Sequence, residues 1–143
     1  MGLDDPTQKM SKSAIGANHA VALLDPPDKI RKTLMRATTD SNPAVDFATA
    51  GPGVLNLISI YQAFTDTPDD AAKAHFAGMR YGDLKKSVAE AVIGALEPIQ
   101  QKYREIITDP GYVEGVLKSA AERVSVVAND TVVKVKRAMG LYA

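Results

Sequence analysis

Apolar residues recur at helical spacing along most of the chain, most clearly after Gly82. One stripe comprises Leu84, Val88, Ala91, Val92, Ala95, Leu96, Ile99, Tyr103 and Ile106. Steps of three and four residues place these side chains on one face of an α-helix, so the pattern predicts a long helix over residues 84–106. Pro98 lies inside this segment and removes one backbone donor, which predicts a kink between Gly94 and Pro98.

A second stripe follows Asp109-Pro110-Gly111. Its members are Val113, Val116, Leu117, Ala120, Val124, Val127, Ala128, Val135 and Met139. This pattern predicts another long helix from about Tyr112, with Gly140 in a C-cap role and a break near residues 129–131. Its valines favour strands, but their spacing by three and four indicates a helix whose conformation is decided by burial.

Three shorter helices are predicted before these two. The first starts at Asp25-Pro26-Pro27, where the aspartate is expected to cap the first turn, and runs to about Ala37. The second covers residues 54–64, which are apolar around most of the helix circumference. The third starts at Thr67-Pro68, with the threonine as expected cap, and runs to about Ala77. The predicted fold class is therefore all-α: a bundle of about five helices, with sequential helices antiparallel.

Residues 1–24 show no sustained periodicity and hold glycine, serine, asparagine and threonine around two lysines, so they predict a flexible loop before the helices. The length of 143 residues suits one compact domain. The absence of cysteine excludes disulfides and thiolate metal sites, and two separated histidines, His19 and His75, predict no bound metal and ordinary polar positions. No secretory leader or membrane-length apolar run is present, which predicts a soluble cytoplasmic protein without a membrane partner.

The strongest chemical signal is Lys9-Met10-Ser11-Lys12-Ser13, within the predicted loop. Two ammonium groups three residues apart, together with hydroxyls and exposed backbone N–H groups, suit the charge of a triphosphate from which pyrophosphate departs. A generic polar loop with two ordinary lysines is the alternative interpretation. The literal five-residue string, however, is expected by chance on the order of once in ten thousand chains of this length.

This motif resembles the second signature of class I aminoacyl-tRNA synthetases, and further runs are similar in order and spacing to the bacterial tryptophanyl type. The similar runs are residues 6–13, 24–25, 29–30, 37–40, 52–61, 81–85 and 135–141. Tyrosyl-tRNA synthetases share the motif but commonly carry a further RNA-binding domain where this chain ends, so the tryptophan type is favoured. Ala14 departs from the acidic residue that many relatives have directly after the motif.

The resemblance implies activation of tryptophan with ATP, accompanied by Mg²⁺, and transfer of the aminoacyl group to tRNA(Trp). It implies that Lys9 and Lys12 are catalytic contacts to the ATP phosphates, Lys12 in the transition state. Met10, Ser11 and Ser13 complete the expected ATP-binding loop. Residues 1–24 would then end a catalytic domain and residues 25–143 form the helical anticodon-side domain.

The H-I-G-H motif and the Rossmann-type pattern of the family are absent, so the chain is expected to be an inactive C-terminal piece. The full-length enzyme is expected to be a homodimer in which this piece packs against its own catalytic domain.

Contacts to RNA are not assigned by the sequence. Neutral net charge, with 17 basic and 17 acidic side chains, gives no separate support for a nucleic-acid partner. The basic candidates are Lys29, Arg31, Lys32, Arg36, Lys102, Arg104, Lys118, Arg123, Lys134 and Arg137. Tyr61, Tyr81, Tyr103 and Tyr112 are candidates for base stacking, although Tyr61 and Tyr103 fall near apolar stripes and are expected in the core. A stand-alone helical RNA-binding or interaction module with a non-catalytic loop remains the alternative function.

Overall fold

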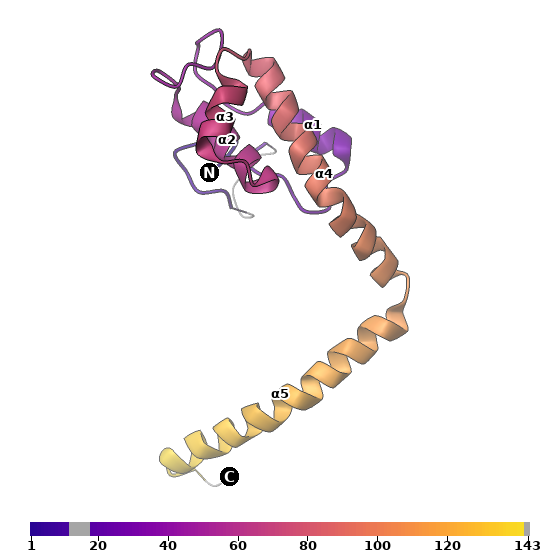
Figure 1. Ribbon diagram of the computed structural model, residues 1–143. Helices are drawn as coiled ribbons and strands as arrows, with labels where there is room; N and C mark the ends of the chain where they lie inside the picture. Colours follow the sequence, from indigo (N-terminus) through magenta and orange to yellow (C-terminus); the bar gives the residue numbers. More distant parts are fainter. Residues whose placement is uncertain (12–17, 142–143) are drawn as a thin grey trace. The chain divides into compact units, whose positions relative to one another are not determined.

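The computed structural model describes residues 1–11 and 18–141 and contains five α-helices in these ranges (Figure 1). They are α1 (Pro27–Met35), α2 (Pro52–Thr65), α3 (Asp69–Phe76), α4 (Tyr81–Ile107) and α5 (Pro110–Ala138). The described residues form no strand, and an isolated antiparallel bridge pairs Ala44 with Arg80. The all-α prediction with about five helices is confirmed.

The chain divides into two compact units, residues 1–100 and residues 101–143, called here the N-terminal and C-terminal units. The first contains α1, α2, α3 and most of α4, and the second contains the end of α4 and all of α5. The predicted division between residues 24 and 25 concerns the architecture of the family and stays a prediction. No described helix combines the length and apolarity that a membrane crossing requires.

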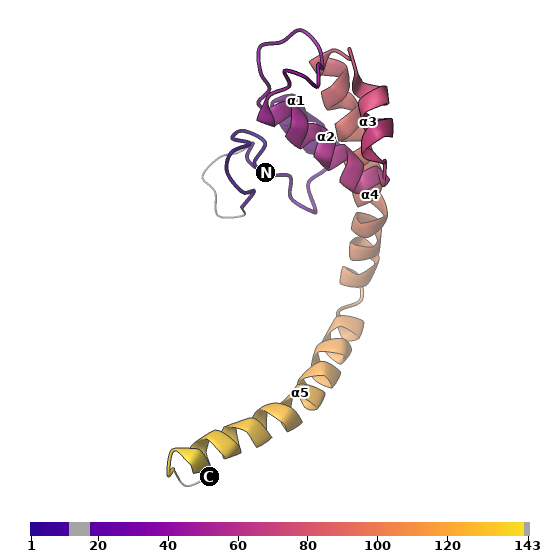
Figure 2. The same ribbon diagram turned by 60° about the vertical axis from the view of Figure 1, so that its left-hand side comes forward.

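Four helices and the first residues of the chain form the core of the N-terminal unit. Its largest fully buried side chains are Phe76, Ile30, Leu34, Leu57, Leu84, Val54 and Val88. Phe76 of α3 is fully buried, and its ring meets the ring of Tyr61 from α2 edge to face at 4.9 Å, which fixes α2 beside α3 (Figure 2). Tyr61 packs against the core as predicted, and each buried side chain of this size stabilises the fold by about 1.5–3 kcal/mol.

Two of the predicted helix caps are wrong. The carboxylate of Asp25 accepts hydrogen bonds from the Ala22 N–H (3.0 Å) and from Lys29 Nζ (2.7 Å), so it does not cap α1. Pro26 and Pro68 are the residues that precede α1 and α3, and neither helix has a side-chain cap. The physical reason is the same in both cases, because proline in an extended conformation ends the preceding segment and the helix begins one residue later than predicted.

In the C-terminal unit, α5 begins and ends with local hydrogen bonds. Asp109 accepts from the Tyr112 N–H (3.0 Å) at its start. At its end Gly140 has a φ of +73°, and the Leu141 N–H reaches the Lys136 carbonyl (2.8 Å). This is a Schellman termination, so the predicted role of Gly140 is confirmed.

The predicted break near residues 129–131 is wrong, because α5 is continuous there. The Thr131 hydroxyl donates to the Val127 carbonyl (2.9 Å), and Lys134 pairs with Asp130 (2.6 Å), so the polar side chains are satisfied within the helix. No residue of α5 is buried, and Tyr103 is exposed, so the burial predicted for the second stripe and for Tyr103 is not found in the described residues. The spacing of the apolar residues predicts the helix correctly but does not show whether its apolar face is buried.

Candidate nucleotide-binding loop

The motif lies in the N-terminal unit, and the structure describes its first three residues. Lys9 and Ser11 are exposed, whereas Met10 is partly buried and packs against the core. Lys12 and Ser13, which complete the predicted ATP-binding loop, lie outside the described residues, as does Ala14. Met10 therefore anchors the start of the motif while the Lys9 side chain faces solvent, where an anionic ligand can reach it.

The chain that leads into the motif is held from two sides. Leu3 is buried, its N–H donates to the His19 carbonyl (3.0 Å), and its carbonyl accepts from the Thr38 N–H (2.7 Å). The Thr38 hydroxyl also donates to the Asp4 carbonyl (2.7 Å). These contacts fix residues 3 and 4 between His19 and Thr38, which follows α1.

A tight turn around Asp5 then directs the chain toward Lys9. The Asp5 carboxylate accepts from the Thr7 N–H (3.0 Å), the Thr7 hydroxyl (2.6 Å) and the Gln8 amide (2.8 Å). These hydrogen bonds, led by those from Thr7, lower the pKa of Asp5, so the turn is stabilised by an ionised carboxylate. The Gly2 N–H closes the turn by donating to the Gln8 carbonyl (2.8 Å).

His19 connects the two ends of this segment. Its side chain is buried, with Nδ1 2.6 Å from Asp4 Oδ1 and Nε2 3.2 Å from the Lys9 carbonyl oxygen. The hydrogen bond to Asp4, followed by that to Lys9, raises the pKa of His19, and the same contact lowers the pKa of Asp4. We call these two contacts the His19 bridge.

The prediction that His19 is an ordinary polar position is wrong. A single histidine without a neighbouring metal ligand or helical register carries no sequence signal for such a bridge. The side chain is also closely fitted, since a Cβ on Gly2 would lie 2.5 Å from His19 Cε1.

An apolar groove of about 370 Å³ lies beside Met10. It is lined by Leu3, Met10, Val21, Leu23, Leu34, Ile60, Phe64, Val92 and Leu96. Without charged side chains this groove does not suit a phosphate group. It places the motif at the edge of a hydrophobic surface of the N-terminal unit.

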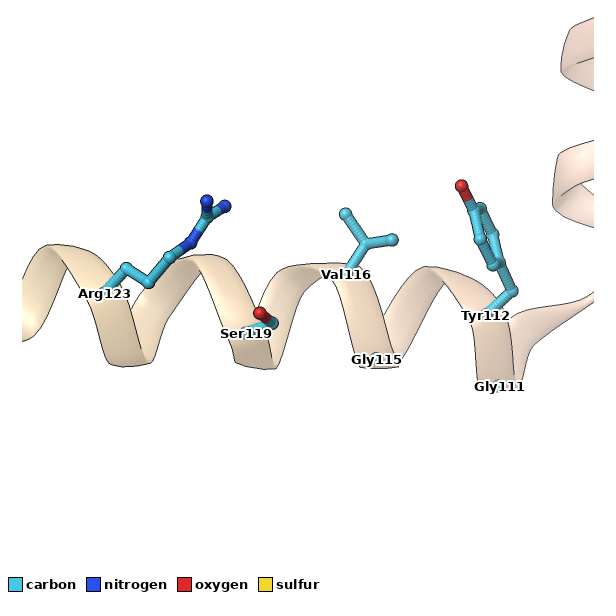
Figure 3. Close-up of a pocket in the computed structure, with 6 residues that line it drawn as sticks. All are labelled: Gly111, Tyr112, Gly115, Val116, Ser119 and Arg123. Atoms are coloured by element: carbon cyan, nitrogen blue, oxygen red, sulfur yellow. The ribbon is translucent and has the colours of Figure 1, made fainter.

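A second, shallow hollow of about 440 Å³ follows one side of α5 (Figure 3). Figure 3 shows the side chains of Tyr112, Val116 and Arg123 extending from one side of the helix, and Gly111, Gly115 and Ser119 complete the lining of the hollow. A single helix lines the hollow, so it encloses nothing. We assign no ligand to it.

Several of the predicted RNA-facing cations have acidic partners. Lys29 pairs with Asp25 (2.7 Å), and Arg31 pairs with Glu90 (2.9 Å). Lys102 and Lys134 pair with carboxylates on their own helices. The cationic side chains remain substantially exposed, although the Asp25 carboxylate that Lys29 contacts is buried. The pairs of Arg31, Lys102 and Lys134 are weak surface pairs that can exchange for phosphate contacts, and RNA binding stays a prediction. The described residues contain no cluster of acidic and histidine side chains suited to a metal ion.

Comparison with known proteins defines the class. Residues 1–97 match the family of class I tRNA synthetases for tryptophan and tyrosine. The chain belongs to this family, as the motif predicted.

Within the family, the chain is similar to tryptophan enzymes. The chain is 48% identical to tryptophan–tRNA ligase of Wolinella succinogenes over 141 residues and 43% identical to that of Thermosynechococcus vestitus. The crystal structure of tryptophanyl-tRNA synthetase from Mycoplasma pneumoniae superposes with a TM-score of 0.83 at 31% identity and covers 99% of this chain. The chain spans 43% of the length of each of these three proteins.

Proposed function

We propose that this chain supplies the ATP-phosphate loop and the anticodon-side helical domain of a tryptophan–tRNA ligase. The observation that supports the proposal is the K-M-S-K-S string at residues 9–13, of which Met10 packs against the core and Lys9 is exposed. Similarity to tryptophan–tRNA ligases over 99% of the chain supports the choice of tryptophan.

In the proposed reaction a carboxylate oxygen of tryptophan attacks the α-phosphorus of ATP. The bond to the bridging oxygen breaks and pyrophosphate leaves, taking the negative charge that develops there. The ammonium groups of Lys9 and Lys12 neutralise this charge, while Met10, Ser11 and Ser13 hold the loop. ATP enters as its magnesium complex, so Mg²⁺ belongs to the substrate.

The second step transfers the tryptophanyl group from the adenylate to tRNA(Trp). The remaining part of the ligase would provide the pockets for adenine and tryptophan, because the groove beside Met10 is apolar and the hollow on α5 is open. We propose a cytoplasmic homodimer assembled through that part, with this chain packed against it and contributing to recognition of the anticodon.

A chimera tests the proposal. The matching 43% of the Wolinella succinogenes ligase is replaced by this chain, and tryptophan-dependent ATP–pyrophosphate exchange is measured. We expect exchange in the chimera and none in the 143-residue chain alone. Lys12→Ala should lower kcat by about 10²–10³-fold with a smaller change in the KM for ATP, because its contact forms mainly in the transition state.

Lys86→Ala is the matched control, since Lys86 is an exposed lysine of α4 outside the loop, and it should leave exchange unchanged. Exchange that is indifferent to Lys12 would contradict the catalytic role. A chimera that folds, as judged by cooperative unfolding, but lacks exchange would favour a helical RNA-binding or interaction module.

A further inference from the structure

The His19 bridge joins the turn before the motif to the backbone of the motif itself. The imidazole ring is buried, and it contacts the Asp4 carboxylate on one side and the Lys9 carbonyl oxygen on the other. The backbone of His19 also receives the N–H of Leu3. The backbone of His19 is therefore held by Leu3, and its two ring nitrogens contact Asp4 and the backbone of Lys9.

Both partners of the ring are hydrogen-bond acceptors only. An ionised carboxylate and a backbone carbonyl have no hydrogen to donate, so each contact requires an N–H on the ring. A neutral imidazole carries one N–H and can make one of the two bonds, whereas the doubly protonated imidazolium makes both. The two distances, 2.6 Å and 3.2 Å, therefore fit the charged ring.

The charges that act on the ring favour this state. Asp4 contacts the ring and Asp5 lies close enough to act on it through space, and both are negative. Asp4 remains 40% exposed, so water reaches this side of the pair. When His19 is protonated, it therefore forms an ion pair with the Asp4 carboxylate and also donates a hydrogen bond to the Lys9 carbonyl oxygen.

We propose that His19 in its doubly protonated form is a positioning residue that holds the backbone of Lys9 for contact with the ATP phosphates. The proposal rests on the proposed function for the meaning of Lys9, but the bridge itself is independent of catalysis. The bridge is complete at pH values below the pKa of His19. It is lost as the pH rises through that pKa, which lies above the ordinary value of 6.5.

The first test measures the bridge in the chain itself, without ATP. Nuclear magnetic resonance follows the His19 ring nitrogens and the backbone amides of Met10 and Ser11 from about pH 5.5 to about pH 9. We expect the amides to shift with the same midpoint as the ring. Asp4→Asn should move that midpoint to lower pH, and His19→Gln should abolish the shift of the amides.

Two control variants match these changes. Asp28→Asn alters a fully exposed carboxylate of α1, and His75→Gln alters the histidine whose ring lies against Tyr61 and Phe76. Both should leave the midpoint of His19 unchanged. Amides that do not follow His19, or a midpoint that ignores Asp4→Asn, would overturn the proposal. Asp4→Asn keeps this test valid if His19→Gln fails to fold, since the Asp4 side chain is exposed.

The second test uses exchange in the chimera with the Wolinella succinogenes ligase. His19→Gln should lower kcat by about tenfold, because moving a catalytic group by about 1 Å can cost up to about 10²-fold in rate. The variant should also flatten the pH dependence above pH 6.5. Asp4→Asn should shift the alkaline limb of the kcat profile to lower pH, which a merely structural role would not do.

The two proposals fail in different ways. If the Met10 amide titrates with His19 but Lys12→Ala does not change exchange, the proposed function is refuted and the His19 bridge stands. Exchange that requires Lys12 but is unaffected by Asp4→Asn and by His19→Gln would refute the positioning role alone.

Discussion

Replacing Gly53 with alanine tests how closely α2 packs on the segment that holds the motif. Gly53 is buried in the first turn of α2, and a Cβ added there would lie 2.1 Å from the Thr38 carbonyl oxygen and 3.0 Å from its carbon. Both neighbours are backbone atoms, so they cannot swing aside as a side chain would. Thr38 in turn holds Leu3 and Asp4 through its N–H and hydroxyl.

The size of the effect follows from this geometry. A methyl carbon packs at about 3.5 Å or more from its neighbours, so α2 and Thr38 would have to separate by more than about 1 Å. Such overpacking costs about 1–3 kcal/mol and sometimes more, and the higher helix propensity of alanine returns at most about 1 kcal/mol. We expect Gly53→Ala to lower the free energy of unfolding by about 2 kcal/mol.

Urea unfolding followed by near-ultraviolet circular dichroism measures this, because the packed rings of Tyr61 and Phe76 report on the N-terminal unit. At a slope of about 2 kcal/mol per molar urea, the midpoint should fall by about 1 M. Gly94→Ala is the control, since Gly94 is exposed within α4 and has open space around it, and it should raise stability slightly. Equal midpoints for the two variants would refute the argument from close packing.

Two further predictions concern the same unit. Phe76→Ala should cost about 3–5 kcal/mol in urea unfolding, because it empties a fully buried site, whereas Phe64→Ala, at a side chain 44% exposed, should cost clearly less; equal losses would contradict the assigned core. Burial and the hydrogen bond to Asp40 raise the pKa of Tyr81 to about 12, so wild-type stability should hold below pH 10 and decline as pH rises from 10 toward 12. Urea midpoints measured on both sides of pH 10 test this, and Tyr81→Phe should show a smaller loss of stability between pH 10 and 12 than the wild type. An equal loss in the two proteins would contradict the reasoning.

The helices were predictable because their apolar positions repeat with the period of the α-helix. The start of α4 near Gly82 and the role of Gly140 follow from local chemistry. The helix continues through Pro98, and the kink expected there stays a prediction. The caps expected at Asp25 and Thr67 failed because each helix begins one residue later than predicted, after a proline in an extended conformation. Asp25 satisfies its carboxylate with Ala22 and Lys29 instead.

The motif could be found from the sequence, whereas the contacts that hold it in the fold could not. Five consecutive residues carry the sequence signal of the proposed ATP-binding loop, because these residues are adjacent in the sequence. His19 lies ten residues beyond Lys9 and is joined to it only by the folded chain. Long-range pairs of this kind have no periodicity and no composition bias, so only the structure identifies them.

The contacts of Gln100 limit the order in which the N-terminal unit can fold during synthesis. Its side-chain amide donates to the carbonyl oxygens of Leu23 (2.9 Å) and Asp25 (3.0 Å), 77 and 75 positions earlier in the chain. A ribosome therefore makes the motif and α1 long before the residue that fastens the start of α1. Leu3 belongs to the same hydrophobic core as the buried residues of α4, which are also synthesised much later. The core around Leu3 can therefore form only when about one hundred residues are available to fold together.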